Sequence, residues 1–239
     1  RSMGWVVRDR SVTETRQAMA DAFPTIAKLP LSFDADALAR DLAAVADDGW
    51  IGHFNRGYHN GGWAGAALRA RWHVTMMDLC EKLSAMAPDT RLKWAGPDMG
   101  VRMFTTARQM EIWSHGQAIY DLVGRDRPAP AARLRNIAEI GVRTFGWTFS
   151  VHKLSVPQSV PHVRLRAPSG EIWEWNAGNA TDRIEGDALA FCQVVTQTRN
   201  VADTSLTVTG DTARHWMSIA QCFAGPPETP PAKGTRFRN

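Results

Sequence analysis

Apolar residues recur every three to four positions through the middle of the chain, which is the pattern of helices with one buried face. This spacing predicts helices over residues 66–87, 104–124 and 131–149. Pro88 and Gly124 mark the ends of the first two helices, and prolines precede the third. In the second and third helices, the residues expected to face the core are Met110, Trp113, Gln117, Tyr120, Leu122, Val123, Leu134, Ile137, Ile140 and Val142.

The pattern changes after residue 157, where apolar and polar residues alternate as they do in half-buried strands. Residues 163–167 and 171–175 predict a β-hairpin around the turn Pro168–Gly170. Further along, the sequence predicts a short strand or turn at 182–186, a helix at 188–198, a strand at 205–209, a helix at 212–223 and an irregular proline-rich tail after 225. Helices followed by a mixture of strands and helices indicate an α+β protein.

We therefore expect three parts in the chain: an atypical N-terminal segment at 1–65, a helical bundle at 66–155 and a small α+β module at 156–239. The first part has a different pattern from the rest. It predicts an edge strand at Ile26–Phe33, where Pro30 excludes a central strand, and then a helix. A loop rich in glycine, asparagine and aromatic residues follows.

The composition is that of an ordinary globular protein. Of 239 residues, 44% are hydrophobic and 22% are charged, with a formal net charge of +4. No apolar run approaches the roughly 20 residues of a membrane-spanning helix, and no signal peptide is visible, so we expect a cytoplasmic protein with no membrane partner. The basic residues are dispersed, which argues against a nucleic-acid partner. Cys80, Cys192 and Cys222 are too scattered for a disulfide framework.

The most informative residues are Glu111 and His115, which lie four positions apart in the second helix and hence on one helix face. A carboxylate and an imidazole placed this way can hold one divalent metal ion from two positions. The same pair also arises where a core histidine hydrogen-bonds to its helix neighbour. The spacing alone therefore leaves both interpretations open.

Three blocks of sequence favour the metal site. They are Thr106–Gln117, Phe191–Arg199 and Trp216–Pro227. With these blocks, residues 68–239 resemble the DinB/YfiT-like metal-binding superfamily, and most of all an actinobacterial branch related to mycothiol-dependent maleylpyruvate isomerase. The resemblance implies a DinB-like four-helix bundle, a divalent metal ion (Zn or Ni) held partly by Glu111 and His115, and mycothiol as a thiol cofactor.

The chain departs from that superfamily at the first metal ligand. Gly4–Asp9 resembles the front of the motif that carries a ligand histidine, but the ligand position is Thr13, whose neutral hydroxyl is a poor ligand. We expect a replacement from a histidine brought near by folding. His59 is the first candidate, ahead of His53 and His73, and water is the alternative.

A second resemblance covers residues 19–69, which look like the start of an aspartyl/asparaginyl β-hydroxylase-like domain, a family of iron and 2-oxoglutarate oxygenases. That family needs a His-x-Asp pair, and no His-x-Asp occurs in this chain. We therefore expect no oxygenase turnover. The segment either replaces the usual first half of the bundle or makes the chain a composite.

Two functions from different classes follow. The first is a thiol-dependent isomerase or transferase of the mycothiol type, in which a low-molecular-weight thiol attacks a small acidic or electrophilic substrate. No cysteine lies near the motif in sequence, which suits an external thiol, and Arg102, Arg108 and Arg143 are candidates to bind the substrate's acidic group or are ordinary solvated residues. The second is a non-catalytic metal- or ligand-binding scaffold, motivated by the missing first ligand. A homodimer is left open.

Overall fold

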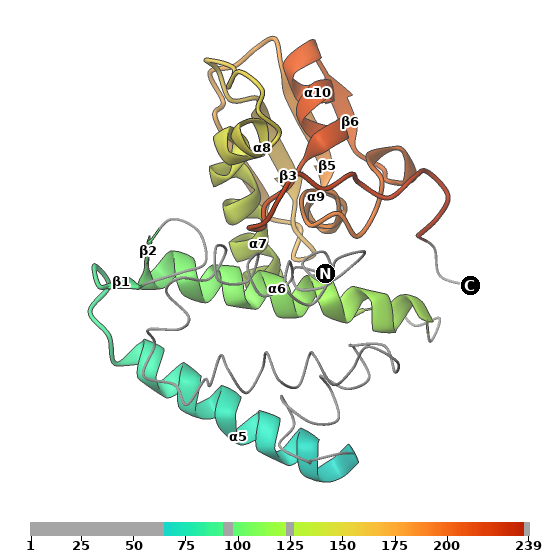
Figure 1. Cartoon of the computed structure of the whole chain (residues 1–239). Helices are drawn as coiled ribbons and strands as arrows, with labels where there is room; N and C mark the ends of the chain where they lie inside the picture. Colours follow the sequence, from blue (N-terminus) through green and yellow to red (C-terminus); the bar gives the residue numbers. More distant parts are fainter. Residues whose placement is uncertain (1–64, 93–97, 123–126, 237–239) are drawn as a thin grey trace, which may run out of the picture. The chain divides into compact units, whose positions relative to one another are not determined.

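The computed structural model describes residues 65–92, 98–122 and 127–236 (Figure 1). The chain divides between Arg102 and Met103 into two units. The strand, helix and loop predicted within residues 1–65 lie outside the described residues, as does Gly124.

The first unit contains α5 (Gly65–Ser84) and a short antiparallel pair of strands, β1 (Arg91–Leu92) and β2 (Met99–Gly100). The helix predicted at 66–87 is therefore present, although it ends three residues early. Its last turn is finished by the Ser84 hydroxyl, which donates to the carbonyl of Cys80 at 2.7 Å.

In α6 (Val101–Leu122), the helix begins three residues before its predicted start. It follows β2 directly, and the backbone N–H of Val101 donates to the carbonyl of Thr90 at 2.9 Å. The predicted core face is confirmed for Met110, Trp113 and Gln117, which are 1%, 6% and 5% exposed.

The third predicted helix is two helices, α7 (Ala131–Arg143) and α8 (Phe145–Val151). The prediction of one continuous helix was wrong at Thr144. Its hydroxyl donates to the carbonyls of Ile140 and Gly141, at 2.7 and 3.1 Å, and such bonds compete with the helix ladder. The expected core residues of α7 are nevertheless buried: Leu134, Ile137, Ile140 and Val142.

The strands of the second unit form one sheet in the order β4-β3-β5-β6. Its strands are β3 (His162–Arg166), β4 (Ile172–Trp175), β5 (Arg183–Asp187) and β6 (Thr207–Thr209). The predicted hairpin is confirmed, because β3 and β4 pair antiparallel with Leu165 opposite Trp173. Residues 182–186, for which the sequence predicts a short strand or turn, nearly coincide with the strand β5, which pairs parallel to β3.

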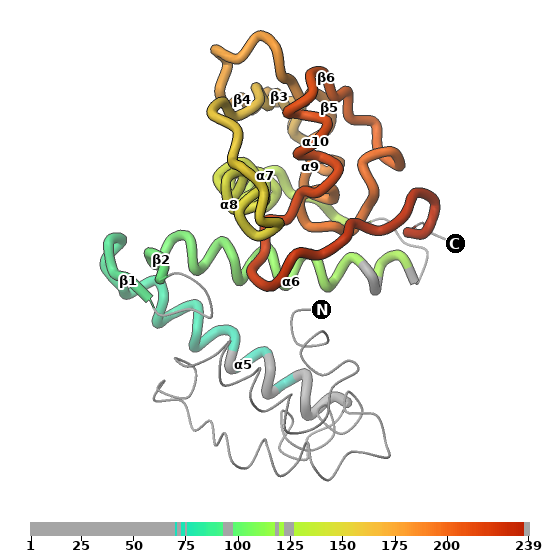
Figure 2. Tube along the Cα trace, turned by 45° about the horizontal axis from the view of Figure 1, so that its top comes forward, coloured from blue at the N-terminus to red at the C-terminus, as the bar shows by residue number. Residues whose placement is uncertain are grey.

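The core lies between one face of this sheet and the helices that cover it (Figure 2). Val163, Leu165, Trp173 and Ile184 turn inward and are at most 2% exposed. They are covered by α9 (Ala188–Val195) and, near β6, by α10 (Asp211–Ile219). Both helices begin at their predicted positions, within one residue, and end three or four residues early.

Buried aromatic residues join the helices of the second unit. The ring of Trp216 lies 5.0 Å from that of Phe145 and 5.9 Å from that of Phe191, in edge-on arrangements that such rings prefer. The helices α7 and α9 pack closely at Gly141, because an added Cβ atom there would lie 2.9 Å from Cγ2 of Val195.

The tail after Gly225 is irregular as predicted, and two buried glutamines hold it on the unit. Gln197 donates to the carbonyls of Ala220 and Glu228, both at 3.1 Å. Gln221 donates to the carbonyl of Pro226 at 3.0 Å and accepts from the N–H of Glu228 at 2.9 Å.

Helices and sheets together confirm a mixed α and β protein. The DinB-like four-helix bundle stays a prediction, as do the domain limits at 65 and 155. Within the ranges described above, no helix has the length and apolar character that crossing a membrane requires.

Candidate functional site

The helix α6 brings Glu111 and His115 together as their spacing predicts. The Nε2 atom of His115 lies 3.1 Å from the Oε2 atom of Glu111. The carboxylate side chain is 19% exposed and the imidazole side chain is 49% exposed, so the pair sits at the edge of the buried face with the histidine toward the outside.

This geometry is compatible with two ligands of one metal ion. A carboxylate oxygen and an imidazole nitrogen that bind a tetrahedral ion at about 2.1 Å are roughly 3.4 Å apart. The observed 3.1 Å separation between Glu111 and His115 is close to that value. The chemistry of the donor set also suits Zn²⁺, which accepts both nitrogen and oxygen ligands.

A third ligand does not come from the described part of the chain, where no three His, Cys, Asp or Glu side chains form a group able to hold a metal ion. His59 and His53 lie outside the described residues and stay predictions. His73 is described, on the exposed side of α5 in the first unit.

Of the three candidate arginines, Arg108 shares the face of the pair. It precedes Glu111 by three residues and His115 by seven, and these spacings place all three side chains on one side of a helix. Arg108 is half-buried, and no described carboxylate forms an ion pair with it. A half-buried guanidinium without a counter-charge is suited to binding an anionic group.

Arg143 is already paired. Its Nε atom lies 2.5 Å from Oε1 of Glu139, whose Oε2 accepts a hydrogen bond from Trp175 at 2.7 Å. Burial raises the pKa of Glu139, but the hydrogen bonds from Arg143 and Trp175, with the charges of Arg143 and Arg135, outweigh burial and lower it. Arg102 falls in the other unit, so its role stays a prediction.

Cys222 lies near this site, and sequence reasoning missed it. Burial raises the pKa of the Cys222 thiol strongly, and the charge of Glu111 raises it further. A thiol with so high a pKa stays protonated at neutral pH and is a poor nucleophile. The sequence contains no local pattern that predicts this proximity, because Glu111 and Cys222 come from distant segments of the chain.

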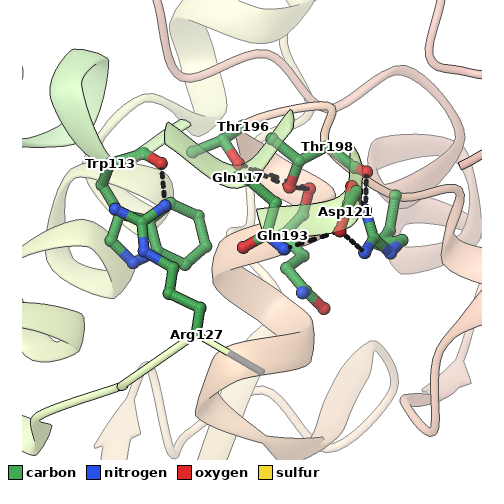
Figure 3. A network of polar contacts seen from close by, with 8 residues as sticks. Trp113, Gln117, Asp121, Arg127, Gln193, Thr196 and Thr198 are labelled. Carbon is green, nitrogen blue, oxygen red and sulfur yellow. Dashed lines mark hydrogen bonds and ion pairs between the residues drawn. The ribbon is translucent and has the colours of Figure 1, made fainter. Parts of the chain in front are cut away.

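A second polar cluster lies on the buried side of α6 and was also missed (Figure 3). Asp121 accepts from both terminal nitrogens of Arg199, at 2.5 and 2.8 Å, and from Nε2 of Gln117 at 2.9 Å. Burial raises the pKa of Asp121, but the hydrogen bonds from Arg199 and Gln117 and the charge of Arg199 outweigh it and lower the pKa.

Comparison with known proteins bears on the segment that carries the pair. Residues 59–120 match the family model of the mycothiol maleylpyruvate isomerase N-terminal domain. The match includes α5 and nearly all of α6, and hence both Glu111 and His115. It supports the mycothiol isomerase part of the resemblance, whereas the DinB/YfiT-like and β-hydroxylase-like parts stay predictions.

Two proteins of Mycobacterium tuberculosis are similar to the chain along most of its length. They are "Uncharacterized protein MT0041" of strain CDC 1551 / Oshkosh and "Uncharacterized protein Rv0036c" of strain ATCC 25618 / H37Rv. Each is 38% identical over 224 residues, which cover 93% of this chain and 79% of the relative. The chain belongs to their family.

The two relatives share most of the N-terminal region, because an alignment that spans 93% of the chain includes most of residues 1–65. This favours an N-terminal segment native to the family over a composite of two proteins. No solved structure gives a significant match to the chain.

Proposed function

We propose that this protein is a thiol-dependent isomerase or transferase that uses a divalent metal ion held in part by Glu111 and His115. One observation carries the proposal. The segment that matches the mycothiol maleylpyruvate isomerase N-terminal domain is the segment in which a carboxylate oxygen and an imidazole nitrogen lie 3.1 Å apart.

The chain's own residues have distinct tasks in this proposal. Glu111 and His115 hold the metal ion, and His59 or water completes its coordination. When bound, Zn²⁺ or Ni²⁺ lowers the pKa of a coordinated thiol and so supplies a nucleophile at neutral pH. Arg108 binds the anionic group of a small acidic or electrophilic substrate on the same helix face.

The thiol comes from outside the chain in this proposal. Cys222 is near Glu111, but burial keeps it protonated, and Cys192 is fully buried with a raised pKa for the same reason. Mycothiol is the proposed thiol because the matched domain is named for a mycothiol-using isomerase.

The alternative is a non-catalytic metal- or ligand-binding scaffold. The observation that favours it is the donor count, because the described residues supply two metal ligands whereas catalytic zinc sites have three protein ligands. Both functions predict metal binding, but only the enzyme predicts turnover of a substrate.

Metal content of the full-length protein tests the site. Wild-type protein dialysed against buffer should keep Zn²⁺ or Ni²⁺ in a stoichiometric amount, measured by plasma mass spectrometry. Glu111→Ala and His115→Ala should each weaken retention by roughly tenfold or more, since each removes one ligand. Glu171→Ala and His215→Ala are the matched controls, because both side chains are exposed and neither lies on α6. Full retention in His115→Ala would remove the site from this helix.

Turnover then separates the enzyme from the scaffold. The metal-loaded protein is assayed with mycothiol and with paired acidic and neutral electrophiles of the same carbon skeleton. Arg108→Ala should raise KM for the acidic compound and leave the neutral one unchanged, whereas Arg143→Ala should change neither, because Arg143 is paired with Glu139. Metal binding without any thiol turnover would favour the scaffold.

A further inference from the structure

Arg127 has a half-buried guanidinium that is held by aromatic rings and a backbone carbonyl. Its Cζ atom lies 4.9 Å from the ring centre of Trp113 and 5.3 Å from that of Tyr120. Figure 3 shows the hydrogen bond that Nη1 donates to the carbonyl of Trp113. No described carboxylate forms an ion pair with this guanidinium. Burial lowers the pKa of Arg127 most, the charge contribution of Tyr120 opposes this by raising it, and the nearby charge of Arg133 lowers it further.

The guanidinium of Arg127 lies against α6 at a glycine. A Cβ atom at Gly116 would lie 3.2 Å from Nη2 and 3.4 Å from Nη1 of Arg127. Contacts of this length are tighter than most Cβ contacts, so a side chain at residue 116 would displace the guanidinium slightly. Gln117 comes four residues after Trp113 and three before Tyr120, so it shares the side of α6 against which the Arg127 guanidinium packs.

Gln117 has a buried hydrogen-bond acceptor with no partner among the described residues. The residue is 5% exposed, and its Oε1 atom makes no hydrogen bond. The amide cannot be reversed, because Nε2 donates to the carboxylate of Asp121 at 2.9 Å and an oxygen in that place would be repelled. In Figure 3 the amide oxygen points away from Asp121, toward the side on which Trp113 and Arg127 lie.

The geometry points to a small-ligand site on this side of α6, formed by Arg127 and Gln117 beside Trp113. Its ligand is a small carboxylate with a neighbouring N–H or O–H group. The carboxylate pairs with the free guanidinium N–H groups, and the neighbouring donor bonds to the Gln117 oxygen. One bound molecule thus supplies an anionic partner to Arg127 and a hydrogen-bond donor to the Oε1 atom of Gln117.

This site is distinct from the proposed metal centre. Trp113 and Gln117 belong to the buried side of α6, whereas Glu111 and His115 lie around the helix from them. The inference therefore does not depend on the proposed function. A purely structural role for Arg127, in which it fastens the segment before α7 onto α6, predicts lost stability on substitution and no selective binding.

Binding of three matched probes to the full-length protein separates these roles. N-acetylglycine has a carboxylate and a neighbouring N–H, acetate has only the carboxylate, and N-acetylglycinamide has no charge. Binding is measured by NMR titration. N-acetylglycine should bind, acetate should bind roughly tenfold more weakly for want of the second hydrogen bond, and the uncharged amide should show no saturation.

Two variants assign the contacts. Arg127→Lys keeps the charge and loses the planar fork, and it should weaken N-acetylglycine binding by roughly tenfold. Gln117→Met keeps the side-chain length and removes the acceptor, and it should reduce N-acetylglycine to the affinity of acetate. Arg108→Lys is the control on the other face of α6 and should have no effect. Equal binding of acetate and N-acetylglycine, no binding in the wild-type protein, or unchanged binding in folded Arg127→Lys would each overturn the inference.

Discussion

The ion pair between Asp121 and Arg199 should contribute strongly to stability. Its side chains are 13% and 11% exposed, and two hydrogen bonds of 2.8 and 2.5 Å join them. Asp121→Asn keeps the shape of the side chain and removes its charge. The guanidinium of Arg199 is then left in the core without a counter-charge.

The magnitude follows from the burial of the pair. Breaking a buried ion pair by removing one partner costs about 3–5 kcal/mol. Arg199 keeps its hydrogen bond to the carbonyl of Thr198 at 2.7 Å, and asparagine can still accept one bond, so we expect the lower end, about 3 kcal/mol. At roughly 3 °C per kcal/mol for a protein of this size, Tm falls by about 9 °C.

The sign of the pH dependence follows from the lowered pKa of Asp121. An aspartate with a lowered folded-state pKa stabilises the fold fully above its unfolded-state pKa, near 4. This stabilisation disappears as the pH falls through the lower folded-state pKa. The difference in unfolding free energy between wild type and Asp121→Asn should therefore be largest at pH 7 and shrink below about pH 4.

The assay is urea unfolding at pH 7 and pH 3, followed by tryptophan fluorescence and far-UV circular dichroism. Glu171→Gln is the control, because its pair with Arg135 has a single 3.3 Å contact and side chains 59% and 52% exposed. That change should cost less than about 0.5 kcal/mol. A cost for Asp121→Asn below about 1 kcal/mol, or one that is equal at both pH values, would refute the reasoning.

Two further predictions concern the backbone and the thiols. Gly210 has φ +89°, and an added Cβ would lie 2.6 Å from the carbonyl oxygen of Thr181, so Gly210→Ala should cost about 3 kcal/mol. Gly170→Ala, at φ +86° with nothing within 4 Å, should cost only about 1 kcal/mol, and equal losses in thermal unfolding would contradict the steric argument. A disulfide reagent at pH 8 should modify exposed Cys80 and spare the two buried cysteines, whose pKa values burial raises, until denaturant is added; three fast thiols in the native protein would disprove this.

The secondary structure of the second unit was largely predictable because its signals are local. Period-two alternation located the hairpin, and helical periodicity identified the buried face of α7. The break between α7 and α8 was missed because periodicity does not register a single hydroxyl. Thr144 bonds back to the carbonyls of Ile140 and Gly141, and this local competition divides an otherwise continuous apolar stripe.

The candidate site was predictable only where one helix supplies it. Glu111 and His115 meet because four residues make about one turn, a fact that the sequence contains. The proximity of Cys222 to Glu111 and the pairing of Asp121 with Arg199 depend on tertiary packing, and no spacing rule links such distant residues. For Arg143 the local spacing was available and was not used: Glu139 lies four residues earlier on the same helix and pairs with Arg143, which was proposed as a substrate-binding residue.

The two sides of α6 differ in a way that makes the metal proposal testable without loss of the fold. The contacts that hold the helix in the second unit come from Gln109, Trp113, Gln117 and Asp121, which bond or pack toward α7, Arg127 and Arg199. The side chain of Glu111 instead hydrogen-bonds to His115 on its own helix, and its charge opposes ionisation of the buried thiol of Cys222. Glu111→Ala therefore removes a ligand without removing a contact of the core. Loss of metal in that variant, with the melting temperature of metal-free wild-type protein, would be a property of the site and not a consequence of unfolding.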